Sequence, residues 1–249
     1  MTLQSGSGRY YRDSMLRSIC AVALLVQAAN APAWPEPPPQ VLPPAAVTLL
    51  SRSLEVSKPL EHHVWRDTAP TNPDGTVNAY VEIPRGERRK FEFNMRRNMR
   101  HVDRVMPLSL GGYPVNYGFV PQTVSYDGDP FDALILGPPL RGGHLTRGVI
   151  VGLMHMEDER GVDSKVVLSR LDSKGQPMHA LGAEDMRLIG DYFNRYKQHE
   201  PGKFSRVPGW DSVQSGKAYV DTTHRFFTEC RRRPDIACEL GARSQDSLD

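Results

Sequence analysis

The sequence has few of the features that would assign it to a class of zinc, nucleic-acid-binding or membrane proteins. Its 249 residues include three cysteines, and no Cys or His cluster has the spacing of zinc ligands. Neither sign of charge is in excess, since 31 Lys and Arg face 29 Asp and Glu, so nothing global indicates nucleic acid or a membrane as a partner. The apolar run at residues 19–26 is also far too short to cross a bilayer as a helix.

Residues 1–33 have the features of an export signal. Three arginines precede the apolar run at 19–26, and residues 29–31 supply the small side chains that a signal peptidase needs. Pro32 would hinder cleavage directly after this site, so cleavage before Trp34 is the alternative. We therefore expect an exported or periplasmic protein without a stable membrane anchor after processing. An amphipathic leader or a tail on a cytoplasmic protein is the competing interpretation.

The cysteines are Cys20, Cys230 and Cys238, and loss of the leader would remove the first of them. On one unbroken helix, Cys230 and Cys238 would lie about 12 Å apart, which is too far for a disulfide. Pro234 would break that helix, so a bridge that closes a small loop stays open. Two free thiols are the preferred interpretation.

The rest of the chain divides into three parts by composition. Seven prolines between positions 32 and 44 indicate an extended linker, and residues 34–75 read as this linker followed by a weakly structured segment. The pair His62-His63 in that segment is interpreted as solvated. Regular patterning begins near Val77, which predicts one folded domain over 76–233 and a C-terminal tail over 234–249.

Short apolar and alternating runs predict a domain rich in strands, with helices near its end. Apolar and polar residues alternate from Val77 to Ile83, the pattern of a half-buried strand. Further strand-like runs lie at 90–94, 115–120, 133–136, 149–154 and 166–168. Apolar spacing predicts a helix over 183–196 and a second helix from about Ser212 to Phe227. Strands followed by two helices predict an α+β fold with a small barrel as its core.

Three aspartates crowd into a turn before one of these runs, at Asp127, Asp129 and Asp132. Gly128 and Pro130 mark the turn, because glycine accepts unusual dihedral angles and proline fixes its own. Like charges this close repel unless a cation lies among them, and oxygen ligands favour a hard ion such as Mg²⁺ or Mn²⁺ over zinc. A solvated acidic turn is the competing interpretation, whereas the spacing does not fit an EF-hand loop.

Two further charge clusters lie on either side of this turn. Eight cations fall between Arg85 and Arg104, and such a run most often forms a solvated hairpin and next most often an anion or nucleic-acid patch. No interleaved aromatic platform accompanies it, which argues against a single-stranded nucleic-acid site. The second cluster is acidic and lies at 157–165 between two strand-like runs, where an exposed charged hairpin is the simplest interpretation.

Together these segments resemble soluble family I inorganic pyrophosphatases. Residues 117–119 followed by 127–132 are similar to the family's Y-G-[FY] and D-x-D-P-x-D signatures. Residues 158–165 resemble its D-x-x-x-x-D-x-K element, and Tyr196-Lys197 resembles its Y-K pair near the end of a long helix. The first of these motifs is long and specific, so the resemblance outweighs the simpler interpretation of each cluster.

The resemblance extends from Val81 to about Trp210, with one-residue length changes after Pro84 and before Tyr113. It implies a five-stranded OB-type β-barrel flanked by helices. The predicted domain over 76–233 is then a catalytic domain, in an exported bacterial member of the family.

The resemblance implies Mg²⁺-dependent hydrolysis of inorganic pyrophosphate to two phosphates by a metal-activated water, with Mn²⁺ or another divalent cation as an alternative cofactor. It assigns the catalytic base to Asp129. It assigns metal ligands to Asp127, Asp132, Asp158 and Asp163. It assigns substrate-binding side chains to Lys90, Arg104, Tyr117, Lys165, Tyr196 and Lys197. It assigns supporting positions to Glu82, Glu92 and Tyr113.

Other functions stay open at this point. A non-catalytic binder of metal–phosphate complexes could use the same barrel, although the full set of acids and cations argues against it. Export would separate the enzyme from cytosolic pyrophosphate, so both scavenging of external pyrophosphate and hydrolysis of other short phosphoanhydrides stay open. An OB-type nucleic-acid binder conflicts with the acids expected in the cleft. We expect pyrophosphate as a partner, no nucleic acid, and a homo-oligomer.

Overall fold

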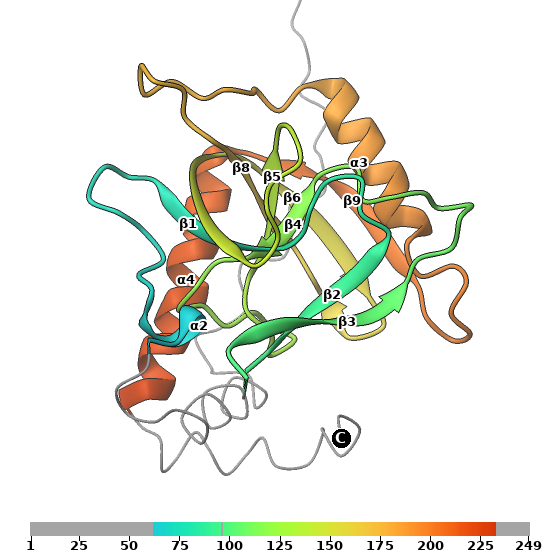
Figure 1. The fold of residues 1–249 in the computed structure, drawn as a ribbon, viewed down its shortest axis with the longest axis horizontal. Coiled ribbons are helices and arrows are strands. Elements are labelled where there is room, and N and C mark those ends of the chain that lie inside the picture. Colours follow the sequence, from blue (N-terminus) through green and yellow to red (C-terminus); the bar gives the residue numbers. More distant parts are fainter. Residues whose placement is uncertain (1–61, 96, 233–249) are drawn as a thin grey trace, which may run out of the picture. The chain divides into compact units, whose positions relative to one another are not determined.

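A computed structural model describes residues 62–95 and 97–232 (Figure 1). The expected leader over 1–33, the proline-rich stretch, Cys238 and the expected tail over 234–249 lie outside these residues. None of the helices within the described ranges is long and apolar enough to cross a membrane.

Five strands close into a barrel, as predicted. In spatial order they are β1 (Val77–Ile83), β4 (Asn116–Phe119), β5 (Asp132–Leu136), β8 (Lys165–Ser169) and β6 (His144–Asp158). β1 closes the ring because it pairs with β4 on one side and with β6 on the other. Neighbouring strands are antiparallel except β5 and β8, which run parallel. The first residues of β5 and β8 therefore lie at the same end of the barrel.

The barrel interior explains why some strands alternate in sequence and others do not. Ala133–Leu136 of β5 is buried on both faces, so this run is apolar throughout. β1 and β4 approach each other closely at Gly118 of β4. A Cβ at this position would lie 1.8 Å from the carbonyl oxygen of Tyr80 on β1, so β1 and β4 can pair here only because the residue has no side chain.

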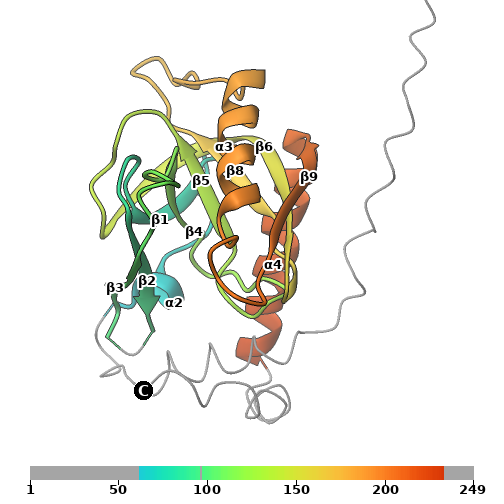
Figure 2. The ribbon, with the colours of Figure 1, turned by 90° about the vertical axis from the view of Figure 1, so that its right-hand side faces the viewer.

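Two long helices follow the barrel close to their predicted bounds. α3 (Ala183–Arg195) packs on β9 (Ser205–Asp211), which pairs with β6, whereas α4 (Val213–Arg232) packs on β6 and β8. Figures 1 and 2 show the two helices against different flanks of the barrel. Phe193 of α3 is buried in the same apolar cluster as Tyr113 and Leu134. This packing fixes the end of α3, and the residues that follow it, beside the barrel.

A separate ribbon of two strands carries the basic run. β2 (Arg89–Asn94) pairs with β3 (Met99–Val105), and the ribbon lies on one side of the barrel in Figure 2. The solvated hairpin expected most often for such a basic run does not describe Arg100. Its guanidinium lies 3.9 Å from the centre of the Phe91 ring and donates to the carbonyl oxygen of Glu82. The ribbon is thereby tied to β1 of the barrel.

The segment before the barrel is packed where it is described, in contrast to the weak structure expected over 34–75. A short helix, α2 (Val64–Asp67), carries Trp65, whose side chain is fully buried. His63 is buried rather than solvated, and its Nε2 lies 2.9 Å from the carbonyl oxygen of Met95. One helical turn is too short to show a period in the sequence, so the burial of these two rings could not be predicted from the pattern.

Candidate active site

The acids of the two motifs meet at one end of the barrel. Three of these acids, Asp127, Asp129 and Asp132, lie before or at the start of β5, and the fourth, Asp163, lies just before β8. Asp132 is the first residue of β5, and Lys165 is the first residue of β8. Because these strands are parallel and Ala133 lies opposite Val166, Asp132 and Lys165 begin side by side.

Lys165 lies between two of these acids. Its Nζ is 2.6 Å from Oδ2 of Asp132 and 2.8 Å from Oδ1 of Asp163, and its side chain is 2% exposed. The hydroxyl of Tyr117 donates to the same Asp132 oxygen at 2.6 Å. Burial lowers the pKa of Lys165, but the two carboxylates raise it by more, so the ammonium stays charged. Burial raises the pKa of Asp163 well above its usual range, and Lys165 opposes this shift.

A tight turn holds Asp127 and Asp129 together. The backbone N–H of Ser125 donates to the carbonyl oxygen of Asp129 at 2.7 Å, and the N–H of Asp129 donates to Oδ1 of Asp127 at 3.1 Å. Gly128 has a φ of 89°, which glycine adopts without strain. Burial, followed by the charge of Asp129, raises the pKa of Asp127 to about 7. Burial also raises the pKa of Asp129, although Arg160 lowers it.

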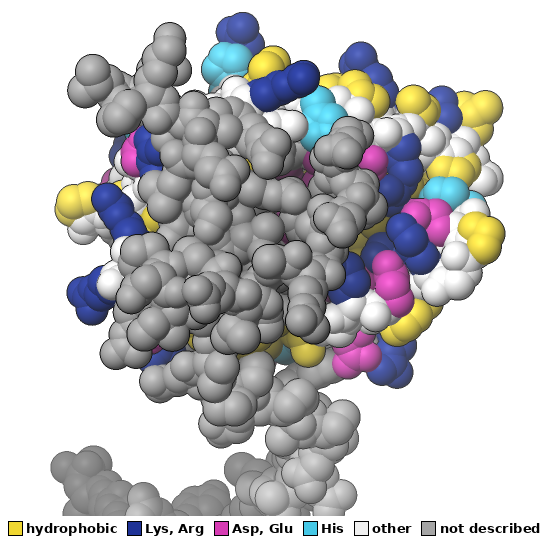
Figure 3. Space-filling view, turned by 90° about the horizontal axis from the view of Figure 1, so that it is seen from below, with side chains coloured by type: hydrophobic (Ala, Val, Ile, Leu, Met, Phe, Trp, Pro, Cys, Tyr) yellow, Lys and Arg dark blue, Asp and Glu magenta, His cyan; other side chains and the backbone are white. Residues whose placement is uncertain are grey.

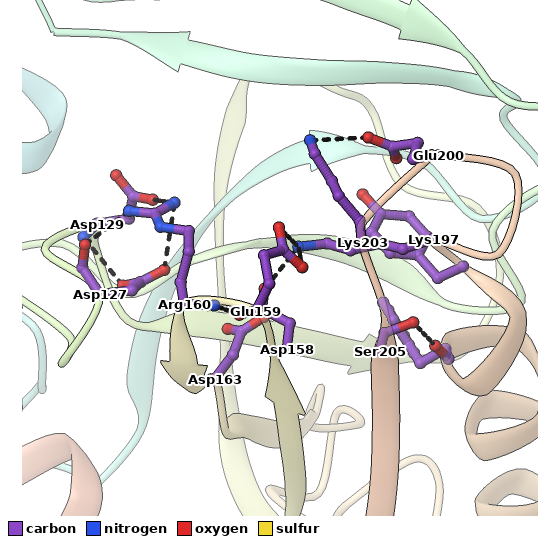
Figure 4. A network of polar contacts seen from close by, with 12 residues as sticks. Asp127, Asp129, Asp158, Glu159, Arg160, Asp163, Lys197, Glu200, Lys203 and Ser205 are labelled. Carbon is purple, nitrogen blue, oxygen red and sulfur yellow. Dashed lines mark hydrogen bonds and ion pairs between the residues drawn. The ribbon is translucent and has the colours of Figure 1, made fainter. Parts of the chain in front are cut away.

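The second acidic motif forms a hairpin. β6 ends at Asp158, and β7 (Gly161–Val162) turns back so that Asp158 lies opposite Gly161. Lys197, just beyond α3, reaches this hairpin from the other side, as Figure 4 shows. Its Nζ lies 2.6 Å from Oδ2 of Asp158 and 2.9 Å from Oε1 of Glu159. Burial raises the pKa of Glu159, but the hydrogen bond and charge of Lys197, together with backbone hydrogen bonds, lower it by more in sum.

Lys90 and Arg104 supply cations from the β2–β3 ribbon, where they lie opposite each other. Lys90 forms an ion pair with Glu92 and lies 3.5 Å from Oδ2 of Asp103. Arg104 donates to Oδ2 of Asp103 at 2.9 Å and to Oε1 of Glu200 at 2.8 Å. For both cations, burial lowers the pKa and nearby negative groups raise it by more.

Buried tyrosines and a buried glutamate connect the ribbon to the acids. The hydroxyls of Tyr113 and Tyr196 lie 3.0 Å apart. Glu82 of β1 is 5% exposed. Burial raises its pKa well above the usual range, and the charges of Glu92 and Asp132 raise it further. Glu82 is therefore near enough to the ribbon and to the start of β5 for the charges of Glu92 and Asp132 to act on it.

Hydrogen bonds, ion pairs and charge interactions thus connect all the predicted site residues in one network. Within residues 62–95 and 97–232, however, no three His, Cys, Asp or Glu side chains converge closely enough to hold an ion. Protein cations lie among the acids instead, with Lys165 between Asp132 and Asp163.

The acids nevertheless fit a divalent cation by their chemistry. Their donor atoms are all carboxylate oxygens, the ligands that hard ions such as Mg²⁺ prefer. The raised pKa values of Asp127 and Asp163 mean that these two groups are buried and crowded with too little compensating charge. A cation bound among them would supply that charge.

The sequence did not single out four side chains that contact this network. They are Glu159, Arg160, Glu200 and Lys203. Arg160 lies 3.0 Å from Asp129, and Lys203 lies 2.8 Å from Glu200. Glu159 and Arg160 lie inside the second acidic motif. Their position at the turn between two strand-like runs was the signal that could have identified them as site residues. Glu200 and Lys203 lie in the segment after α3, where no periodic pattern indicates which side chains face the site.

Surface charge is mixed on the face drawn in Figure 3. Lys and Arg side chains alternate there with Asp, Glu and hydrophobic side chains on the coloured part of the surface. Among the described cations of the basic run, Lys90 and Arg104 join the network described above, whereas Arg89 is exposed and pairs with Glu87 at 2.6 Å.

Comparisons with known proteins agree with this arrangement. A family profile described as inorganic pyrophosphatase matches residues 79–228. An inorganic pyrophosphatase from Aeropyrum pernix is 39% identical over 155 residues, which are 59% of this chain and 87% of that protein. One from Sulfolobus acidocaldarius is 35% identical over 153 residues, which are 59% of this chain and 88% of that protein. The solved structure of an inorganic pyrophosphatase from Coxiella burnetii matches with a TM-score of 0.60 at 34% identity, covering 64% of this chain and 99% of that one.

Proposed function

The chain belongs to the inorganic pyrophosphatase family, and from this premise we propose how its own residues hydrolyse pyrophosphate to two phosphates. The protein is thus an inorganic diphosphatase, a hydrolase of a phosphoanhydride. One observation carries the assignment of the site. Lys165 is buried between Asp132 and Asp163 where two parallel strands begin, so that a cation and acids meet at one end of the barrel.

The acids are the proposed cation ligands. Asp127, Asp132 and Asp163 hold the principal divalent cation in this proposal, and Asp129 or Asp158 reaches a second one. Mg²⁺ is the proposed ion, because hard oxygen ligands suit it. When bound, the cation neutralises phosphate charge and lowers the pKa of a coordinated water.

Six side chains bind the two phosphoryl groups in this proposal, namely Lys90, Arg104, Tyr117, Lys165, Tyr196 and Lys197. The cations among them are now paired with carboxylates, as Arg104 is with Glu200 and Lys197 with Asp158. Pyrophosphate is a polyanion, so its oxygens can replace these carboxylates as partners. Arginine can bind two oxygens at once, whereas each lysine acts as a point charge.

Asp129 is the proposed base that takes the proton of the attacking water. Its side chain is 48% exposed at the turn, so water can reach it, and its raised pKa makes its carboxylate a stronger proton acceptor than an ordinary aspartate. Glu92 and Tyr113 are supporting groups because they contact Lys90 and Tyr196. Glu82 is the third supporting group, and its raised pKa favours the protonated, neutral carboxyl there.

A phosphate-release assay tests the proposed function. The full chain should release two phosphates from each pyrophosphate with Mg²⁺, and the release should stop when EDTA removes the metal and resume when Mg²⁺ is added in excess. Tripolyphosphate in a parallel reaction tests whether other short phosphoanhydrides are better substrates. Pyrophosphate binding without phosphate release would contradict the proposal and indicate a non-catalytic binder.

Two wider properties are also proposed. We infer export with cleavage of the leader, supported by the charge and apolar pattern of residues 1–33. A mature N-terminus near Pro32 or Trp34, found by mass spectrometry of secreted or periplasmic material, would support it, and an intact Met1 in the cytosol would contradict it. A homo-oligomer is expected from the family, and a monomeric mass in solution would contradict that expectation.

A further inference from the structure

Arg160 is a cation within the acidic network to which no role has been given. It is the second residue of the two-residue turn between β6 and β7, and its backbone N–H donates to Oδ1 of Asp158 at 2.7 Å. Its side chain crosses to the first acidic motif, as Figure 4 shows. There Nη1 lies 3.0 Å from Oδ2 of Asp129 and 3.8 Å from Oδ2 of Asp127, and Nη2 donates to the carbonyl oxygen of Asp127 at 2.7 Å. One guanidinium therefore links the two motifs.

Exposure distinguishes Arg160 from Lys165, the other cation that lies among these aspartates. The side chain of Lys165 is 2% exposed, whereas those of Arg160 and Asp129 are 47% and 48% exposed. An exposed ion pair contributes little, but breaking a buried pair leaves an uncompensated charge. Arg160 can therefore leave its partners at low cost and turn into solvent, whereas Lys165 is held in place.

We propose that Arg160 is an internal counter-ion of Asp127 and Asp129, which a divalent cation displaces when it binds to them. The inference rests on the proposed function, because it takes Asp127 as a metal ligand. The guanidinium contacts oxygens of both aspartates, so a divalent cation on Asp127 would lie close to it and repel it, and the guanidinium and the metal compete for these oxygens. Arg160 thereby lowers the affinity of Asp127 and Asp129 for the metal and raises the metal concentration that is needed to occupy this site.

Mn²⁺ binding in the absence of substrate tests this competition. Titration calorimetry and the electron paramagnetic resonance signal of free Mn²⁺ are recorded for the parent, Arg160→Gln, Arg160→Lys and Arg206→Gln. The last variant is the matched control. Arg206 of β9 pairs with Glu157 at 2.6 Å, so its loss removes the same charge beside the same hairpin and leaves Asp127 and Asp129 untouched.

Arg160→Gln is expected to bind Mn²⁺ about fivefold more tightly than the parent, the size of effect that loss of one exposed ion pair produces. Arg206→Gln should match the parent, and Arg160→Lys, which keeps the charge but loses the two-pronged contact, should fall between. Circular dichroism checks the fold, and the lysine variant decides the question if the glutamine variant does not fold.

Two different failures can be told apart. Equal or weaker Mn²⁺ binding by Arg160→Gln, or an equal gain in Arg206→Gln, overturns the counter-ion proposal and leaves the proposed function standing. No Mn²⁺ binding by the parent contradicts the proposed function, and the counter-ion proposal with it.

Discussion

Asp132 and Lys165 lie 33 positions apart in the sequence, yet Nζ of Lys165 is 2.6 Å from Oδ2 of Asp132. The contact arises because β5 and β8 are parallel neighbours in a barrel whose other neighbouring pairs are antiparallel. Tyr117 reaches the same carboxylate from β4, and Asp163 reaches the same ammonium from the residues before β8. The topology of the barrel thus assembles the centre of the site.

The first prediction concerns the buried charge of Lys165. Lys165→Met keeps an unbranched side chain that is one atom shorter but leaves Asp132 and Asp163 without their counter-charge, and breaking a buried pair costs roughly 3 kcal/mol. The variant should therefore lose about that much unfolding free energy in urea titrations without metal. Added Mg²⁺ should restore part of the loss, because it supplies the missing charge.

A matched control for Lys165→Met is Arg187→Met on α3. Arg187 pairs with Glu184 and Asp191, but its side chain is 57% exposed. Solvent screens such pairs, so this variant should unfold at the parent's urea concentration. An equal loss of unfolding free energy in both variants would contradict the claim that the ion pairs of Lys165 stabilise the fold because they are buried.

The second prediction concerns how Arg104 binds phosphate. Its two terminal nitrogens contact different acids, Asp103 and Glu200, which is a geometry that lysine cannot reproduce. Arg104→Lys should raise KM for pyrophosphate about tenfold, since it loses one charge-assisted hydrogen bond. Initial rates of phosphate release over a range of pyrophosphate concentrations measure the change. Arg89→Lys, on the exposed part of the same ribbon, should leave KM unchanged, and equal KM values for both variants would remove Arg104 from the substrate site.

The third prediction concerns stability at low pH and His63. Its Nδ1 accepts a hydrogen bond from the backbone N–H of Arg66 at 3.1 Å, and its Nε2 lies 2.9 Å from the carbonyl oxygen of Met95. The ring is thus neutral in the fold, and burial lowers its pKa below the usual value of 6.5. Below that value the unfolded chain binds the proton more readily than the folded chain does, so the contribution of His63 is present at higher pH and is lost as the pH falls.

His63→Asn isolates this effect, because asparagine can accept the same backbone hydrogen bond and does not titrate. The parent should be more stable than the variant at about pH 7.5, and the difference should shrink at about pH 5.5. Urea titrations at the two pH values give the difference. A difference that is independent of pH would contradict a neutral His63.

Among the strands predicted from the sequence are β1, whose sequence alternates although all its residues except Asn78 are buried, and β5, which is apolar throughout after Asp132. β3 and β9 were not predicted, because most of their side chains are at least partly exposed and Pro208 interrupts the β9 pattern. β6 extends well beyond its apolar part to Asp158, since pairing with β7 and β9 continues the strand through charged residues.

The candidate site was predictable to the extent that its residues lie in local motifs. Asp127, Asp129 and Asp132 share one turn, so their crowding could be deduced from spacing alone. The partners of these acids could not, because the contact between Arg160 and Asp129 joins residues 31 positions apart and depends on how the barrel closes. The sequence indicated that a cation belongs among the acids, and the described structure places Lys165 and Arg160 there.

Turnover by Asp132→Asn tests the central claim most directly. Asparagine has nearly the shape of aspartate but lacks its charge, so the fold should persist, with the parent's circular dichroism spectrum. Phosphate release from pyrophosphate at saturating Mg²⁺ should fall by about 10²-fold or more, the size of loss expected when one charge-stabilising group is removed from an active site. Turnover equal to that of the parent would contradict a role for Asp132 in catalysis.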